Sequence, residues 1–212
     1  MAAYSPSTPV TRSPASTQSN IEMEFKIHEE KTVYNGHFKI KEAKVTHDTF
    51  SGHRLQVTRQ CFERGNSAAA VIYESDSNSL LFTRQFRYPT VKACNGWIVE
   101  LVAGSIDESD ENPEDCIRRE IFEELGYNVQ STEKITTFFT SPGGSSEQVH
   151  LYYAEVTSAD RTIRGGGVSS EKEDIELVRI PADRIELGEF SDAKTLLGLQ
   201  WFLLRKQSKR RE

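Results

Sequence analysis

The sequence has no run of 18 apolar residues, which argues against a membrane-spanning helix. It also has few cysteines. Cys61, Cys94 and Cys116 are far apart and form no Cys-x-x-Cys pair. An odd, scattered set of this kind does not make a disulfide framework and is typical of a reducing compartment. We therefore expect a cytoplasmic protein that does not associate with membranes.

Excess positive charge and zinc-ligand spacing are missing as well. Lys and Arg number 26 against 32 Asp and Glu, a formal net charge of −6, which argues against a non-specific nucleic-acid binder. An anionic ligand would need another attraction, and a bound metal ion is the obvious candidate. The five histidines have no metal-ligand spacing, so no zinc site is predicted; they are His28, His37, His47, His53 and His150.

Both ends of the chain are poor in core-forming residues. The first 20 residues are rich in Ser, Thr and Pro and lack the apolar stretch of a secretory signal. We predict a disordered tail over residues 1–22, with an organellar targeting segment as the alternative. Residues 207–212 are predicted to form a basic, solvated tail.

Between the tails, strand signals dominate. Alternating stretches over residues 24–62 are broken by Asn-Gly and Ser-Gly turn signals, which predict antiparallel strands. β-Branched and aromatic content predicts further strands at 68–74, 80–86, 97–104, 135–141, 148–156 and 174–180. The pattern predicts one ordinary-sized domain with an elaborated end, built on a mixed sheet of the α+β or α/β/α class.

Two helices are predicted. In the central one, Asn112 is a helix cap, Pro113 suits the first position, and Gly126 is the expected left-handed residue after the end. The second helix spans residues 191–206 and begins at a Ser191 or Asp192 cap.

The central helix gathers carboxylates beside its apolar stripe. Glu120 and Glu124 are one turn apart, and Arg119 is one turn before Glu123 and can pair with it. Like charges at this spacing repel, and a divalent cation between them turns the repulsion into attraction. The alternative is a solvated acidic helix face, which is the usual meaning of two adjacent glutamates.

The wider segment from Gly104 to Tyr127 resembles the Nudix box: Gly, five residues, Glu, seven residues, then Arg-Glu-U-x-Glu-Glu-x-Gly-U, where U is apolar. The matching positions are Glu111, Arg119, Glu120, Ile121, Glu123, Glu124, Gly126 and Tyr127. Two departures exist: six residues separate Gly104 from Glu111, and the final U is Tyr. The extra residue puts the path of the loop in doubt, but not the carboxylate geometry.

The resemblance to Nudix proteins continues over about residues 60–200. It involves RQFR (84–87), WIVELVAG (97–104), SPGGSSE (141–147), GGGVSSEKEDIE (165–176) and DAKTLLGLQWF (192–202). These segments are similar to the branch that hydrolyses ADP-ribose and GDP-mannose. Four shorter stretches are most similar to bacterial GDP-mannose pyrophosphatases: EDCIRRE (114–120), SPGG (141–144), GGGV (165–168) and DAKT (192–195). The resemblance implies an α+β fold: an α/β/α sandwich with a mixed sheet over 63–206, plus an N-terminal antiparallel sheet over 23–62 that is exchanged in a homodimer.

The resemblance also implies a Mg²⁺ site, in which Mn²⁺ can substitute. Its ligands would be the carbonyl oxygen of Ala103 and the side chains of Glu120, Glu124 and Glu173. Glu171 is the candidate general base, although the roles of Glu171 and Glu173 can be exchanged. Glu123 is a further candidate, for catalysis or for a second or third ion.

Other residues receive binding or structural roles by the same resemblance. Candidates for substrate contact are Arg64, Arg87, Glu100 and Glu147. Arg119 is expected to orient Glu123, and Gly104 and Gly126 are expected to be structural. Phe86 or Tyr88 are candidates for stacking on the base, although an aromatic residue near a strand is more often part of the core.

Taken together, the resemblance implies a Mg²⁺-dependent hydrolase. It would cleave the diphosphate of a nucleoside diphosphate sugar to a nucleoside monophosphate and a sugar phosphate. A non-catalytic nucleotide-sugar-binding module is the alternative, but such a module is expected to lose the metal carboxylates. A purely structural dimeric scaffold leaves those glutamates unexplained. Isomerase relatives of the fold need a pocket cysteine and a glutamate. Cys94 is the only candidate for that cysteine, and its surroundings do not match.

Overall fold

The computed structural model describes residues 22–209, so the predicted N-terminal tail, apart from Glu22, lies outside the described residues. The same holds for residues 210–212 and for the side chains of Glu171 and Lys209. The chain divides into two compact units. One consists of the residues up to Lys31 with Glu42–Arg59, and the other of Thr32–Lys41 with the chain from Gln60 onward. No helix in the described residues is long and apolar enough to cross a membrane.

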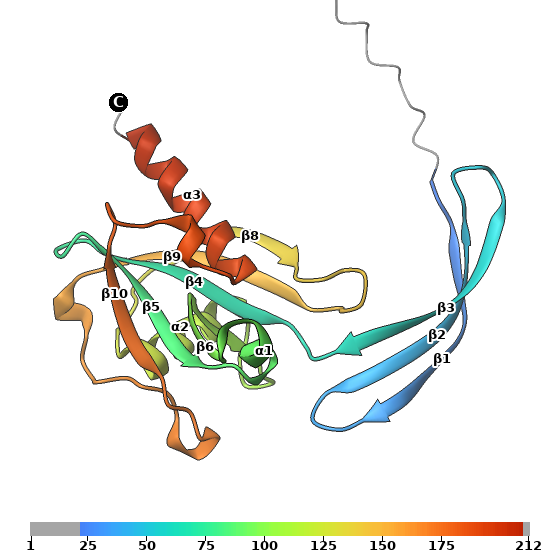
Figure 1. The fold of residues 1–212 in the computed structure, drawn as a ribbon, viewed down its shortest axis with the longest axis horizontal. Helices are drawn as coiled ribbons and strands as arrows, with labels where there is room; N and C mark the ends of the chain where they lie inside the picture. Colours follow the sequence, from blue (N-terminus) through green and yellow to red (C-terminus); the bar gives the residue numbers. More distant parts are fainter. Residues whose placement is uncertain (1–21, 210–212) are drawn as a thin grey trace, which may run out of the picture. The chain divides into compact units, whose positions relative to one another are not determined.

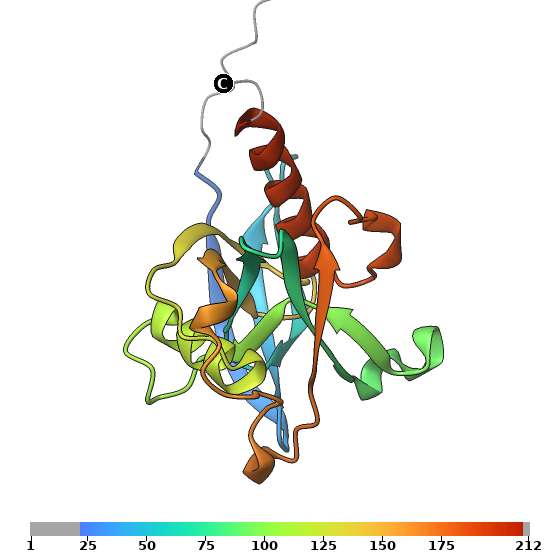
Figure 2. The same ribbon diagram turned by 90° about the vertical axis from the view of Figure 1, so that its left-hand side faces the viewer.

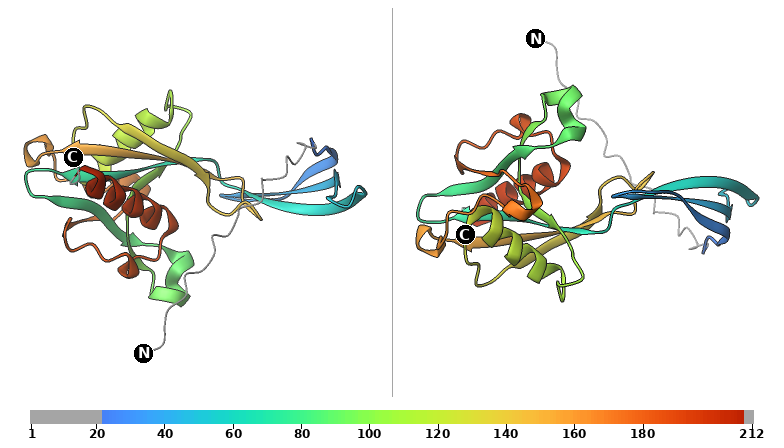
Figure 3. Two further views of the ribbon diagram at one scale, coloured as in Figure 1. Left: turned by 90° about the horizontal axis from the view of Figure 1, so that it is seen from above. Right: turned by 90° about the horizontal axis from the view of Figure 1, so that it is seen from below.

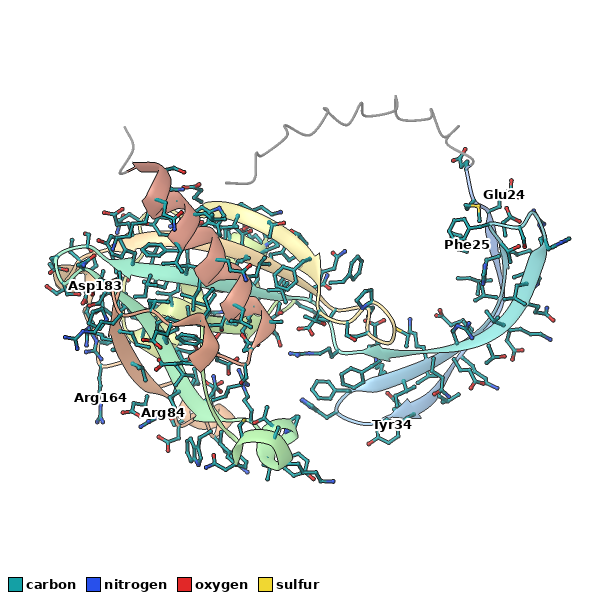
Figure 4. The ribbon with its side chains drawn as sticks, turned by 45° about the horizontal axis from the view of Figure 1, so that its top comes forward. Glu24, Phe25, Tyr34, Arg84, Arg164 and Asp183 are labelled. Atoms are coloured by element: carbon teal, nitrogen blue, oxygen red, sulfur yellow. The ribbon has the colours of Figure 1, made fainter. Side chains whose placement is uncertain are left out.

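The N-terminal strands form a sheet of their own, as the turn signals predict. The sheet has the order β1-β2-β3 and consists of β1 (Phe25–Asn35), β2 (Lys39–Asp48) and β3 (Arg54–Glu63). Short turns join neighbouring strands (Figure 1), which makes them antiparallel. Every residue of β1 is exposed. Phe25 and Tyr34, labelled in Figure 4, are 71% and 59% exposed. In the described chain, therefore, this sheet has no apolar core.

The larger sheet has seven strands and is mixed, as predicted. Its main order is β10-β5-β4-β9-β8, with β6 paired to β5 and β7 paired to β4. Only the β4–β9 pair is parallel among the pairs of this sheet. The strands are β4 (Ser67–Glu74), β5 (Ser79–Phe86), β6 (Trp97–Glu100), β7 (Val102–Ser105), β8 (Glu133–Phe139), β9 (Gln148–Val156) and β10 (Glu176–Pro181).

Helices cover both faces of this sheet. Helix α2 (Pro113–Glu120) and the turn η2 (Ile121–Leu125) lie on one face, and α3 (Ala193–Lys209) lies on the other (Figure 3). Alternate residues of β4 belong to opposite cores: Ala68 and Ala70 pack on the α2 side, and Ala69 and Val71 on the α3 side. Burial on both faces explains why β4 is a continuous apolar run. The α/β/α sandwich is confirmed.

The predicted strand over 97–104 is two strands. The N–H of Leu101 donates to the Thr195 hydroxyl at 2.9 Å, so this residue leaves the ladder and the chain turns from β5 toward β4. One short helix was not predicted: α1 (Val91–Cys94) follows η1 (Tyr88–Thr90) between β5 and β6. The remaining turns are η3 (Ser158–Asp160), η4 (Ser169–Glu171) and η5 (Leu187–Glu189).

Candidate active site

Helix α2 begins and packs as its sequence predicts. The Asn112 side chain accepts hydrogen bonds from the N–H groups of Glu114 and Asp115, at 2.9 and 3.1 Å. On the opposite face, Ile117, Ile121 and Leu125 are fully buried in the core. Burying such side chains contributes about 1.5–3 kcal/mol each. The helix is therefore fixed against the sheet, and its carboxylates lie at the edge of the core.

The last turn departs from the predicted α-helix, because η2 is a π-helical turn. The N–H of Gly126 lies 3.2 Å from the carbonyl oxygen of Ile121 and 3.0 Å from that of Phe122. Gly126 has a φ of 82°, the left-handed conformation expected from its sequence position. Single π-turns inside helices are frequent at functional sites, and this one carries Glu123 and Glu124.

Glu124 is the most deeply buried carboxylate of the helix. Its side chain is 2% exposed, and its Oε2 atom has no hydrogen-bond partner among the described residues. Burial raises its pKa well above the ordinary value, and the charges of Glu120 and Glu173 raise it further. The pKa is therefore sensitive to two other carboxylates nearby, and a buried oxygen without a donor is costly unless something positive binds it.

Glu120 lies over Gly104. A Cβ atom added to Gly104 would be 1.9 Å from the Glu120 carboxyl carbon, so a larger residue there would force this side chain to move. Burial raises the pKa of Glu120 to about 7, and the charges of Glu123 and Glu173 raise it while that of Arg119 lowers it. The Arg119 guanidinium donates to Glu120 at 2.8 Å and to Glu123 at 3.1 Å, which confirms the predicted pairing with Glu123.

Arg119 has a further partner that the sequence pattern did not identify. Its Nε and Nη2 atoms donate to the two carboxylate oxygens of Asp110, at 3.2 and 3.1 Å. The Asp110 side chain is 4% exposed, whereas Glu111 is exposed. Five residues separate Gly104 from Asp110, which is the glycine-to-acid spacing of the Nudix box. Because the loop has one extra residue, the acidic partner of Arg119 is Asp110, one position before Glu111, which aligns with the box glutamate.

The late loop brings Glu173 to this helix. The Glu173 carboxylate accepts from the N–H of Val168 at 3.0 Å and lies over Gly167, where an added Cβ would be 2.7 Å from its Oε2 atom. Its charge acts on both Glu120 and Glu124. The three predicted metal-site carboxylates therefore interact electrostatically. The Glu171 side chain lies outside the described residues.

The four residues predicted to contact substrate pair with one another. Arg64 lies 3.2 Å from Glu147, and Arg87 donates to Glu100 at 2.7 Å. Both glutamates are buried, and Arg87 also acts electrostatically on Glu124. Glu100 has a second cation, Lys194 of α3, which the residue patterns did not single out. The only feature of the sequence that pointed to Lys194 is the DAKT segment at 192–195, which resembles Nudix relatives.

The donor set fits a hard divalent cation. Carboxylate oxygens are the ligands that Mg²⁺ prefers, and Glu124 offers one without a partner. Within residues 22–209, no three acidic, His or Cys side chains already surround one point. Two of the carboxylates are instead engaged by donors: Glu120 by Arg119, and Glu173 by the Val168 N–H.

The described hollows do not enclose these carboxylates. A cavity of about 410 Å³ is lined by Arg84, Trp97, Asp174 and Glu176. A second, also of about 410 Å³, borders Glu123 and the loop from Ile163 to Ser169. Neither includes Glu120, Glu124 or Glu173. The base-stacking candidates Phe86 and Tyr88 are 51% and 80% exposed, so neither is a core residue.

Comparison with known proteins agrees with this arrangement. A family model described as the NUDIX domain matches residues 63–197. The chain belongs to the Nudix family. The matched region contains α2, η2 and the late loop, so the acidic helix is a Nudix helix and its resemblance to the box is confirmed.

Relatives of this Nudix chain include enzymes of one named activity. It is 41% identical over 160 residues to a GDP-mannose pyrophosphatase of Cronobacter sakazakii (strain ATCC BAA-894), covering 73% of this chain and 82% of the relative. It is 34% identical over 187 residues to a GDP-mannose pyrophosphatase of Enterobacter sp. (strain 638), covering 84% and 95%. A solved structure titled ADP compounds hydrolase has the same fold, with a TM-score of 0.65 at 19% identity, covering 89% of this chain and 96% of that chain.

Proposed function

We propose that the protein is a Mg²⁺-dependent hydrolase of nucleoside diphosphate sugars of the GDP-mannose or ADP-ribose type. Water would attack one phosphorus of the diphosphate, and a P–O bond of the bridge would break. The products are a nucleoside monophosphate and a sugar phosphate. The named activity of the relatives supports this substrate class.

The observation that carries the proposal is the group of Glu120, Glu124 and Glu173. Glu124 has a buried oxygen without a partner, and the charges of the other two glutamates reach it. In a protein without a cation to bind, such a group is only destabilising, because burial and repulsion both oppose ionisation. A solvated acidic face does not explain a glutamate that is 2% exposed.

These residues hold the metal in our proposal, together with the carbonyl oxygen of Ala103. When bound, Mg²⁺, or Mn²⁺ in its place, neutralises diphosphate oxygens and acidifies water. The chain's own residues position and exchange protons: Glu171 accepts the proton of the attacking water, and Glu123 assists or binds a further ion. Arg87, beside Glu124 and Glu100, donates to phosphate oxygens. Arg64 and Glu147 contact the nucleotide.

The test measures phosphate that a phosphatase can release after incubation with Mg²⁺ and GDP-mannose, ADP-ribose, UDP-glucose or a nucleoside triphosphate. We expect turnover of a sugar nucleotide, and a loss of about 10²–10³-fold in kcat for Glu124→Gln. Glu114→Gln is the matched control: the same charge is removed from the same helix, where Glu114 pairs with Arg118. Tight binding without turnover in the wild type would favour the non-catalytic binding module instead.

We also propose that the protein is a cytoplasmic homodimer. The N-terminal sheet supports the dimer, because β1 is exposed along its whole length and carries Phe25, Ile27 and Val33. Exposed apolar groups of this extent mark a protein–protein surface. All three cysteines are free, which is consistent with a reducing compartment.

A further inference from the structure

A glycine segment of the late loop is hydrogen-bonded to the carboxyl end of the Nudix helix. The N–H of Gly166 donates to the Glu124 carbonyl oxygen at 2.8 Å, and that of Gly167 donates to the Glu123 carbonyl oxygen at 3.1 Å. Figure 2 shows the segment after β9, in orange, beside the end of this helix. The last carbonyl groups of a helix have no partner within it. Here the loop supplies the donors.

Neighbouring residues extend this contact on both sides. The Arg161 side chain donates to the Leu125 carbonyl oxygen at 3.2 Å, and the N–H of Thr162 donates to that of Gly126 at 2.9 Å. The segment is therefore not an open, flexible linker. It is fixed to the same turn that carries Glu123 and Glu124.

The close approach requires glycine on both sides. Gly165, Gly166 and Gly167 have φ values of 70°, 114° and 88°, which side-chain-bearing residues rarely adopt. A Cβ on Gly165 would lie 2.6 Å from the Glu124 carbonyl oxygen, and one on Gly126 would lie 2.1 Å from the Ile163 carbonyl oxygen. Both clashes are with backbone, so no side-chain rotation relieves them.

Gly167 differs from its neighbours because it faces Glu173. A Cβ there would lie 2.6 Å from the Glu173 Cβ and 2.7 Å from its Oε2 atom. The adjoining Val168 N–H donates to that same oxygen at 3.0 Å. The main chain of the loop thus donates hydrogen bonds to the helix from Gly166 and Gly167. It contacts the Glu173 carboxylate through Gly167, which lies against it, and through the N–H of Val168, which donates to it.

We propose that this glycine segment positions Glu173 against Glu124, so that the late-loop carboxylate and the helix carboxylates act on one cation. The role of the segment is to set the distance between two ligands that are about 50 residues apart in sequence, with no side chain of its own in the site. The expected effect on catalysis rests on the proposed function. The positioning of Glu173 by the glycine segment does not depend on it.

The main test is Gly167→Ala, with Gly188→Ala as the matched control. An added Cβ at Gly188 meets nothing within 4 Å, and Gly188 does not have a positive φ. Binding of Mn²⁺ alone is measured by calorimetry on the full chain, together with the thermal midpoint. We expect the dissociation constant of Gly167→Ala to rise by about tenfold or more, as for other groups that orient a metal ligand, and that of Gly188→Ala to stay at the wild-type value.

A double-mutant cycle separates positioning from a general loss of structure. If Gly167 acts through Glu173, then adding Gly167→Ala to Glu173→Gln leaves Mn²⁺ affinity at the value of Glu173→Gln alone. Equal losses in both backgrounds would overturn the proposal, as would wild-type affinity in Gly167→Ala. If Gly167→Ala does not fold, Val168→Pro replaces it in the same cycle, because it removes the Val168 N–H that donates to Glu173, and the thermal midpoint shows whether the fixed φ of proline disturbs the fold.

Kinetics and hydrogen exchange complete the experiment. We expect Gly167→Ala to lower kcat at saturating Mg²⁺ while KM for GDP-mannose changes little, and we expect slow exchange of the Gly166 and Gly167 amides in the wild type. Fast exchange of both amides would contradict the docking. A wild type that hydrolyses no sugar nucleotide would contradict the proposed function alone, because the metal-binding cycle and the exchange data are independent of turnover.

Discussion

Asp110 and Arg119 form a bidentate ion pair beside the Nudix helix, and Arg119 also contacts carboxylates of that helix. Asp110 is nearly buried and receives two hydrogen bonds from the guanidinium, whose remaining nitrogen reaches Glu120 and Glu123. The Arg119 charge is thus shared among four carboxylates, because its Nη2 atom also lies 3.7 Å from Asp107. This sharing limits how strongly Arg119 competes with a cation for Glu120. The pair also lowers the pKa of Asp110, through its hydrogen bonds with Arg119, and so keeps it ionised.

Removing the Asp110 charge is predicted to weaken metal binding. The Asp110→Asn substitution keeps the shape of the side chain but removes its charge, so Arg119 pairs more closely with Glu120 and Glu123. We therefore expect Mn²⁺ affinity to fall about ten- to hundredfold. Glu111→Gln is the control, because Glu111 is exposed and matches the box only by alignment. Calorimetric titration of both variants measures the effect. A larger loss in Glu111→Gln would show that Glu111 is the partner of Arg119 in solution.

At the scale of elements, a buried polar group ties the end of the Nudix helix to two strands. The Tyr127 hydroxyl donates to Glu74 of β4, and Arg179 of β10 donates to Glu74 at 3.1 Å and to the Tyr127 hydroxyl at 2.7 Å. Ser77 also donates to Glu74, at 2.6 Å. This group accounts for a tyrosine where the Nudix box has an apolar residue. Its ring fills the core, and its hydroxyl reaches the only acid of β4.

The Glu74 group predicts a specific pH dependence of stability. Burial raises the pKa of Glu74, but the bonds from Ser77, Tyr127 and Arg179 outweigh burial and leave it below the ordinary 4.5. The stabilisation by ionised Glu74 is therefore present above about pH 4.5 and is lost as the pH falls through the folded-state pKa. Glu74→Gln should lower the free energy of unfolding by about 1.5–3 kcal/mol at pH 7, and the gap to the wild type should narrow toward pH 3.

Urea unfolding of both proteins between pH 7 and pH 3, with a chelator present, measures this gap. Glu189→Gln is the control, because Glu189 is exposed and its loss should leave the unfolding free energy nearly unchanged. A gap between the wild type and Glu74→Gln that stays constant over the range would show that Glu74 contributes by shape rather than by charge.

At the scale of the whole molecule, residues 22–209 contain one sheet with a core on each face and one sheet without a buried core. The seven-stranded sheet is covered by helices on both faces, whereas β1 of the N-terminal sheet is exposed throughout. A three-stranded sheet needs a covered apolar face to be stable. A second copy of the chain is the cover that we propose.

Charge placed on the N-terminal sheet is predicted to dissociate the homodimer that we propose. Ile27 is 50% exposed on β1, and Leu204, at 64%, is an exposed leucine of α3. We expect light scattering to give twice the chain mass for the wild type and for Leu204→Asp, but a shift toward the single-chain mass, with loss of activity, for Ile27→Asp. A wild type that is monomeric at micromolar concentration would contradict the homodimer.

How far the sequence predicts this protein depends on the range of the interactions. Asn112 and Gly126 mark the Nudix helix through contacts within a few residues, so its ends were predictable. The break at Leu101 was not, because it depends on Thr195, which is 94 residues away. The same reason applies to Lys194, whose partner Glu100 is equally distant in sequence.

The sequence by itself determined the Nudix family, the acidic helix and the mixed sheet, because spacing and local propensity act over one or two turns of chain. Only the tertiary structure decided that Asp110 rather than Glu111 pairs with Arg119, that the last turn is a π-turn, and that a glycine segment is bonded to it. The pairing of Asp110 depends on the exact path of a loop, and the bonding of the glycine segment depends on backbone approach between segments distant in sequence. A pattern of residue types specifies neither the path of a loop nor how closely two distant segments approach each other.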